Sequence, residues 1–295
     1  MKGVMNGPTP EGAPDGPNLG TADGRTVELT APAKLTVTLQ VTGVREDGYH
    51  FLESEMVTLD LVDTLVIDLD GDAGLDVVPE WPGDDDGWRD LDMGAVEDNL
   101  ASRAMAAVGR TAHVTLVKRI PPGAGLGGGS ADAAAVLRWA DCTDLAIASR
   151  IGADVPFCLG GGRARVSGIG DEVALLPFED RRYLLLFPPF GVDTAAVYRA
   201  WDRLAAAGPH SDGEATSNGL EAAAVEVEPR LADWKRALEE RTGRPAHLAG
   251  SGSTWFVEGA TEEFGVELGA GLWLDGQHAP LVATRTTPAA GEVLQ

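Results

Sequence analysis

Hydrophobic and polar residues alternate strictly between residues 34 and 42. One set of positions holds apolar side chains, beginning with Leu35 and Val37, and the other holds polar side chains, beginning with Lys34 and Thr36. A repeat of two residues is typical of a strand that buries one face. We therefore expect a half-buried strand here, with Lys34 and Thr36 side by side on its polar face.

Further along the chain, short apolar runs alternate with longer segments of helical composition. The Gly-, Asp- and Pro-rich segment 71–92 has little periodicity, and we interpret it as a loop. Mixed strands and helices of this kind indicate an α+β protein. The other predicted elements are strands at 64–69, 113–120, 255–257 and 281–284 and one starting at Tyr183, a hairpin of 163–166 with 172–176, helices at 99–108, 131–140, 144–151, 194–206 and 231–242, a helix beginning at Asp154, and a helix between the last two strands.

The chain length of 295 residues allows one large domain or two ordinary ones. Residues 1–24 are rich in Gly, Pro, Asn and Asp and lack the apolar stretch of a signal peptide. We interpret 1–27 as a disordered acidic leader. A charged segment near residue 180 interrupts two apolar strands, so the predicted domains are 28–180 and 181–288.

The composition argues against several classes of partner. A formal charge of −23 repels nucleic acid and anionic membranes, and no window has the apolar length of a membrane span. The five histidines are scattered without zinc-ligand spacing, so no structural metal site is predicted. Two cysteines, Cys142 and Cys158, are too few for a disulfide framework and fit a reducing cytoplasm. We interpret the acidity itself as a solubility feature.

The strongest local signal lies in segment 121–133, where a strand enters a glycine-rich loop and a helix leaves it. Five of the seven residues 123–129 are glycines, which lets backbone N–H groups converge on a ligand. The start of the following helix offers unpaired N–H groups and the positive end of the helix dipole. The segment therefore predicts a phosphate-binding site.

Other interpretations of this loop fit the residues less well. A Walker A motif needs a lysine before Ser130, and a glycine stands there. Gly123, Gly125 and Gly128 match G-x-G-x-x-G, but a dinucleotide fold needs a second buried strand where segment 144–151 has helical composition. A purely structural glycine turn would require fewer glycines than are present.

The loop resembles that of the galactokinase, homoserine kinase, mevalonate kinase and phosphomevalonate kinase (GHMP) superfamily. Its Gly-Gly-Gly-Ser form is similar to that of the 4-diphosphocytidyl-2-C-methyl-D-erythritol kinases. Further agreeing segments are Ala-Pro-Ala-Lys-Leu at 31–35, Arg-Glu-Asp-Gly-Tyr-His at 45–50, Gly-Ala-Asp-Val-Pro-Phe at 152–157 and Gly-Ser-Gly-Ser-Thr at 250–254, with weaker support from Asn-Leu-Ala at 99–101 and Asn-Gly-Leu-Glu at 218–221.

The resemblance spans roughly residues 28–286 and implies a two-domain α+β GHMP kinase fold. The implied N-terminal domain is ribosomal protein S5 domain 2-like and binds ATP, and the C-terminal domain is a ferredoxin-like α/β domain. The chain departs from the family pattern in two places. Thr36 stands where the family usually has Asn, and the segment between the glycine loop and Asp154 is shorter than usual.

Two residues are candidates for catalysis. From the residues alone, Asp154 is a candidate helix N-cap and Lys34 a solvated lysine on a strand. The resemblance implies instead that Asp154 is the catalytic base and that Lys34 lies against it. There Lys34 would keep the carboxylate ionised and help to orient the substrate hydroxyl.

The resemblance also implies where the nucleotide binds. The glycine loop would hold the phosphates of ATP, with Ser130 near the oxygens bound to Mg²⁺, and Asn99 would contact adenine. The implied nucleotide-binding residues are Asn99, Pro122, Gly123, Ala124, Gly125, Leu126, Gly127, Gly128, Gly129 and Ser130.

For the second substrate, Tyr49 and His50 match the family's cytidine-recognition pair. Tyr198 lies where the family often has a second aromatic residue, so that Tyr49 and Tyr198 could sandwich the cytosine. Thr36 and Thr194 complete the implied substrate-binding set. Two alternatives to cytosine stacking stay open. In the first, Tyr49 only caps a hairpin; in the second, Tyr198 faces the protein core from its helix.

The resemblance thus implies a kinase that uses ATP to phosphorylate the 2-hydroxyl of 4-diphosphocytidyl-2-C-methyl-D-erythritol in non-mevalonate isoprenoid biosynthesis. The alternatives are another GHMP kinase, of the homoserine or mevalonate type, and a nucleotide-binding relative without catalysis. The expected partner is a small molecule, and the expected assembly is a monomer or a weak homodimer in the cytoplasm.

Overall fold

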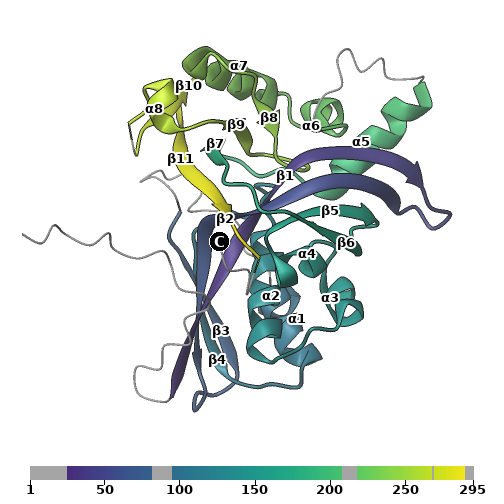
Figure 1. The fold of residues 1–295 in the computed structure, drawn as a ribbon, viewed down its shortest axis with the longest axis vertical. Coiled ribbons are helices and arrows are strands. Elements are labelled where there is room, and N and C mark those ends of the chain that lie inside the picture. The colour runs from purple at the N-terminus through teal and green to yellow at the C-terminus, as the bar shows by residue number, and fades with distance from the viewer. Residues whose placement is uncertain (1–24, 82–94, 208–217, 268, 290–295) are drawn as a thin grey trace, which may run out of the picture.

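The computed structural model describes residues 25–81, 95–207, 218–267 and 269–289 (Figure 1). Residues 1–24 of the predicted leader lie outside this set. Thr26, inside the segment assigned to the leader, begins the first strand of the sheet. Among the helices described, none is long and apolar enough to cross a membrane.

The molecule is organised around a long antiparallel pair of strands, β1 (Thr26–Val44) and β2 (His50–Asp68). Both extend well beyond the strands predicted at 34–42 and 64–69. The prediction of a half-buried β1 is wrong around Lys34, because both of its faces are covered there. The glycine loop packs on the polar face, and the backbone N–H of Lys34 donates a 3.0 Å hydrogen bond to the carbonyl of Leu126.

Four shorter strands extend this sheet: β3 (Gly74–Pro79), β4 (His113–Lys118), β5 (Arg163–Gly168) and β6 (Glu172–Leu176). β3 corrects the prediction that segment 71–92 is a loop, and residues 82–92 of that segment lie outside the described residues. β3 pairs in parallel with β4, and its Leu75 and Val77 pack against the core. This pairing joins residues that are distant in sequence, so local composition does not reveal it.

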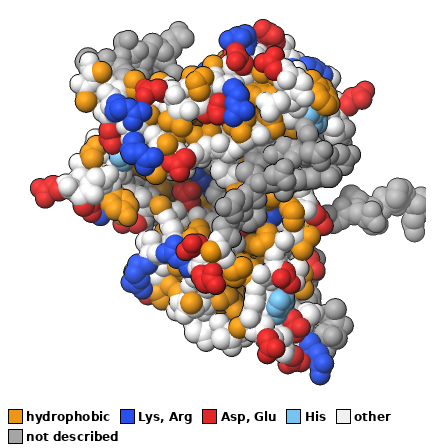
Figure 2. All heavy atoms as spheres, turned by 180° about the vertical axis from the view of Figure 1, so that it is seen from behind, with side chains coloured by type: hydrophobic (Ala, Val, Ile, Leu, Met, Phe, Trp, Pro, Cys, Tyr) orange, Lys and Arg blue, Asp and Glu red, His pale blue; other side chains and the backbone are white. Residues whose placement is uncertain are grey.

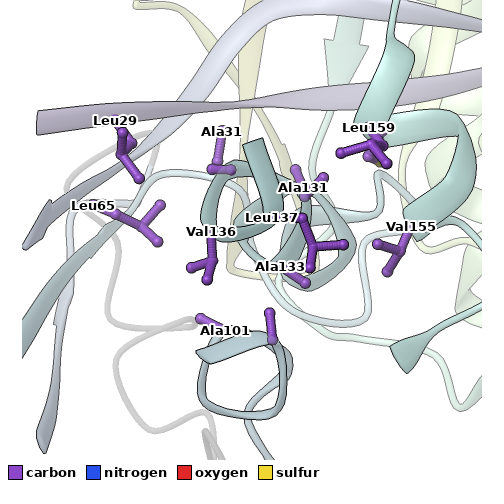
Figure 3. Close-up of a cluster of buried hydrophobic side chains, with 14 of the residues drawn as sticks. Leu29, Ala31, Leu65, Ala101, Ala131, Ala133, Val136, Leu137, Val155 and Leu159 are labelled. Carbon is purple, nitrogen blue, oxygen red and sulfur yellow. The ribbon is translucent and has the colours of Figure 1, made fainter. Parts of the chain in front are cut away.

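Four helices cover one face of this part of the sheet: α1 (Leu100–Ala107), α2 (Gly128–Trp139), α3 (Leu145–Ile151) and α4 (Val155–Gly160). The predicted helices are confirmed, but α2 begins earlier than predicted, inside the glycine run. Figure 3 shows α2 packed between the strands and α1, with small side chains such as Ala131 and Ala133 at its contacts. Small residues allow α2, and with it the phosphate loop, to lie close to the sheet.

The second half of the chain continues with β7 (Arg182–Leu186), α5 (Thr194–Ala207), α6 (Glu221–Val227), α7 (Arg230–Thr242), β8 (His247–Leu248), β9 (Trp255–Glu258), α8 (Thr261–Phe264), β10 (Gly271–Leu274) and β11 (Gln277–Thr287). The predicted helices and strands of this half are confirmed, and α6, β8 and β10 were not predicted. A second core, around Trp234 and Trp255, lies between these helices and strands.

Strand β11 links the two halves. It pairs with β7 over five residues and with β2 through Thr286 and Thr287, so the strand order β3-β4-β2-β11-β7-β9-β8 is continuous. A third core cluster contains Leu35 and Leu59 from the first half and Phe187 and Phe256 from the second. Residue 180 lies between β6 and β7, and the division into two domains there remains our proposal.

Candidate active site

The side chains of Lys34 and Asp154 meet between β1 and α4. Lys34 Nζ lies 3.3 Å from Asp154 Oδ2, and the two side chains are 7% and 30% exposed. Asp154 is the residue before α4, yet its side chain makes no capping hydrogen bond. The carboxylate is therefore directed to Lys34 instead of the helix N-terminus, and Lys34 is not a solvated surface lysine.

Thr36 lies beside Lys34 because strand alternation places both side chains on the same face of β1. Lys34 Nζ donates a 3.0 Å hydrogen bond to Thr36 Oγ1, and both residues are buried. The structure therefore brings the side chains of Lys34, Thr36 and Asp154 together.

The glycine loop approaches this group too closely for side chains. Gly127 has a left-handed φ of +66°, and a Cβ on it would lie 2.8 Å from Lys34 Cγ. A Cβ on Gly125 would lie 2.0 Å from the carbonyl oxygen of Ala249. Gly127 is also the N-cap of α2 and supplies no capping side chain, so the N–H groups of the first turn stay available to an anion.

A second loop, 250–254, reaches the same place from the other half of the chain. The backbone N–H of Ser253 donates to the carbonyl of Gly123 at 3.0 Å, and Thr194 Oγ1 lies 2.8 Å from Ser251 Oγ. Buried Asn218 donates its amide to the carbonyls of Leu248 and Gly250 at 2.8 and 2.6 Å. These bonds hold loop 250–254 and the glycine loop together around Lys34.

The predicted adenine contact, Asn99, is the N-cap of α1. Its Oδ1 accepts a 2.9 Å hydrogen bond from the backbone N–H of Ala101. The neighbouring Leu100 packs beside Gly129, where a Cβ would lie 3.6 Å from Leu100 Cδ1. Asn99 therefore starts a helix that borders the phosphate loop. Ser130, in the first turn of α2, is 9% exposed.

The aromatic residues of the implied cytidine site lie in different environments. Tyr198 contacts the ring of His50, with ring centroids 4.7 Å apart, whereas Tyr49 is 59% exposed and lies under the guanidinium of Arg45. Tyr198 is partly buried against the second core. Burial raises the pKa of its phenol, and the negative charge of Asp154 adds to the shift. The His50–Tyr198 pair and Asp154 thus belong to one region.

A buried charged group beneath the phosphate loop was not predicted. Lys118 Nζ binds the carboxylates of Asp63 and Asp132, the latter at 2.8 Å, and all three are almost fully buried. Burial raises the pKa of Asp132 to about 7, while the charge of Lys118 opposes the shift and that of Asp63 adds to it. Alternation could have revealed two of them, because Lys118 and Asp63 occupy buried-face positions of β4 and β2.

Figure 2 shows a hollow between the upper and lower parts of the molecule, with acidic and basic side chains inside it. In the described part of the chain, no group of three or more His, Cys, Asp or Glu residues is arranged to hold a metal ion.

Comparisons with known proteins find similar sequences and folds. The family profile "GHMP kinases N terminal domain" matches residues 98–162. A 4-diphosphocytidyl-2-C-methyl-D-erythritol kinase of Paracoccus denitrificans is 40% identical over 247 residues, which cover 77% of this chain and 84% of that protein.

Two solved structures are similar in fold. A crystal structure of 4-(cytidine 5'-diphospho)-2C-methyl-D-erythritol kinase has a TM-score of 0.59 and 33% identity, covering 78% of this chain and 89% of that one. The L. major mevalonate kinase in complex with R-mevalonate has a TM-score of 0.58 at 11% identity, covering 89% and 96%.

Proposed function

The chain belongs to the 4-diphosphocytidyl-2-C-methyl-D-erythritol kinase family and has the α+β GHMP kinase fold, and from this we propose that it uses ATP to phosphorylate the 2-hydroxyl of 4-diphosphocytidyl-2-C-methyl-D-erythritol, a step of non-mevalonate isoprenoid biosynthesis. The observation that carries this proposal is the Lys34–Asp154 pair, 3.3 Å apart, with the glycine loop packed against Lys34.

Asp154 has the properties of a general base for the acceptor hydroxyl. Phosphoryl transfer needs positioning, neutralisation of charge and a group that takes the hydroxyl proton. The ammonium of Lys34 lies 3.3 Å from the carboxylate, and its hydrogen bond to Thr36 fixes its direction. Asp154 would take the proton while Lys34 orients the oxygen that attacks the terminal phosphate of ATP.

The phosphates of ATP would lie against the first turn of α2. Its N–H groups lack a capping side chain, and the glycines leave room for the phosphates to approach the backbone. Magnesium fits this site as a companion of the phosphates, because it is usually held by substrate oxygens, water and few protein ligands, and the hydroxyl of Ser130 lies in that turn. Bound there, it would neutralise phosphate charge.

The cytidylyl end of the acceptor would lie beside His50 and Tyr198. Their ring contact, and the charge of Asp154 acting on Tyr198, support one continuous site from the nucleobase to the reacting hydroxyl. Tyr49 would stack from the exposed tip of the hairpin, and Thr194 would contribute from the start of α5.

The proposal also covers the partners, the location and the assembly of the enzyme. The formal charge of −23 disfavours nucleic-acid partners. Free Cys142 and Cys158 support a cytoplasmic location. We expect a monomer or a weak homodimer acting on small molecules.

Turnover of ATP with three acceptors tests the proposed function. We expect kcat/KM to be far higher with 4-diphosphocytidyl-2-C-methyl-D-erythritol than with homoserine or mevalonate. Equal or faster turnover of either smaller alcohol would assign the chain to another GHMP kinase activity. ATP binding without turnover of any acceptor would favour the non-catalytic relative.

A further inference from the structure

His50 is the point at which the β1–β2 hairpin meets α5. Its ring lies 4.7 Å from that of Tyr198 and 5.5 Å, edge to face, from that of Trp201, and its Nε2 lies 2.8 Å from Asp202 Oδ1. Tyr198, Trp201 and Asp202 are spaced i, i+3 and i+4, so they share one face of the helix. The His50 side chain is only 9% exposed, so its orientation is closely defined.

The contact with Asp202 determines which ring nitrogen of His50 carries the proton. An ionised carboxylate only accepts hydrogen bonds, so Nε2 must be the donor. In neutral imidazole the other nitrogen, Nδ1, is then an acceptor. Within the described residues, Nδ1 has no hydrogen-bond partner, so this acceptor is available to a ligand.

Resting on the proposed function, we propose that Asp202 is a positioning residue for base selection: it holds His50 with Nδ1 as an acceptor for the 4-amino group of cytosine. Cytosine carries a donor at this position, whereas uracil carries a carbonyl acceptor. Two acceptors that face each other leave both without a partner, so a uridylyl substrate is rejected. Trp201 and Tyr198 support the ring in this orientation.

A role in base selection differs measurably from a purely structural role. The Asp202 side chain is 48% exposed, so its hydrogen bond to His50 contributes little to stability. Loss of a merely structural contact would weaken the binding of cytidylyl and uridylyl substrates alike. Loss of the defined tautomer changes the ratio between them, because His50 can then also present Nδ1–H to a carbonyl.

The test compares kcat/KM for 4-diphosphocytidyl-2-C-methyl-D-erythritol and its uridylyl analogue in the wild type and in Asp202→Ala. We expect the cytidylyl preference to fall by at least about tenfold, through KM of the cytidylyl substrate, with KM for ATP and kcat unchanged within about twofold. The matched control is Arg203→Ala, which removes an exposed ion pair of α5, with Glu226, and should leave the preference unchanged.

The same substitution made in a His50→Ala variant shows whether Asp202 acts through His50. In His50→Ala, the further change Asp202→Ala should not alter the remaining preference, because the residue that reads the base is already gone. The long-range ¹⁵N–¹H spectrum of His50 should show the proton on Nε2 in the wild type and a mixture of tautomers in Asp202→Ala.

An unchanged preference in Asp202→Ala, or an equal loss for both substrates, overturns the inference. So does an effect of Asp202→Ala that persists in the His50→Ala background. A wild type that turns over neither nucleotide substrate contradicts the proposed function instead, so the two failures are distinguishable.

Discussion

The ammonium nitrogen of Lys34 lies 3.3 Å from a carboxylate oxygen of Asp154, although β1 and α4 are far apart in the sequence. Gly127 makes this approach possible, because any side chain there would collide with the stem of Lys34. The same glycine is the N-cap of α2. The proposed base, its lysine partner and the proposed phosphate site are therefore joined through one loop.

Gly125 should be far less tolerant of alanine than a glycine of similar backbone conformation in open space. Gly125 and Gly243 have φ values of +78° and +66°, but an added Cβ would collide with the Ala249 carbonyl only in Gly125→Ala. We expect Gly243→Ala to cost about 1–2 kcal/mol of unfolding free energy, and Gly125→Ala clearly more. Urea denaturation measures both. Equal costs would show that the close approach of the two loops is not required.

Thr36 should contribute through its hydroxyl. Thr36→Val keeps the shape but removes the acceptor of the Lys34 hydrogen bond, so we expect a loss of about 1–3 kcal/mol in stability and a lower kcat. Thr36→Ser retains the hydroxyl and serves as the control. Thr36→Asn restores the residue usual in the family and should keep kcat/KM within about tenfold of the wild type. If Thr36→Val changed neither the stability nor kcat, this role of the hydroxyl would be contradicted.

Stability should depend on pH through Asp132. Its pKa is raised by burial to about 7, so the folded protein favours the protonated form more than the unfolded chain does. This contribution is complete below about pH 4 and is lost as pH rises through about 7. Asp132→Asn cannot titrate, so the wild type should lose stability relative to this variant between about pH 5 and pH 8. A constant difference in unfolding free energy across this range would contradict the assignment.

The sequence patterns located much of the site but not its assembly. Alternation placed Lys34 and Thr36 on one strand face, and the glycine spacing located the phosphate loop, because both signals are local. Strand β3 was missed because it depends on pairing with β4, which is distant in sequence. The contact of His50 with Asp202 depends on how α5 packs on the hairpin, which no local pattern encodes.

The burial of Lys118, Asp63 and Asp132 was not predicted, for a similar reason. Lys118 lies in a strand-like run whose alternation points it inward, yet a lysine is seldom expected in a core. Its burial becomes favourable because Asp63 and Asp132, from β2 and α2, surround it. Partners that meet only in the folded structure cannot be paired from spacing alone.

The single-turnover rate of Asp154→Asn with ATP and 4-diphosphocytidyl-2-C-methyl-D-erythritol tests the central claim most directly. Asparagine keeps the shape but cannot accept the proton, so the rate should fall by about 10²–10⁴, while ATP affinity and the melting temperature stay close to the wild type. The side chain makes no capping hydrogen bond, so the substitution removes no helix cap. Near-normal phosphoryl transfer with an earlier melting transition would show that Asp154 stabilises the fold and that the base lies elsewhere.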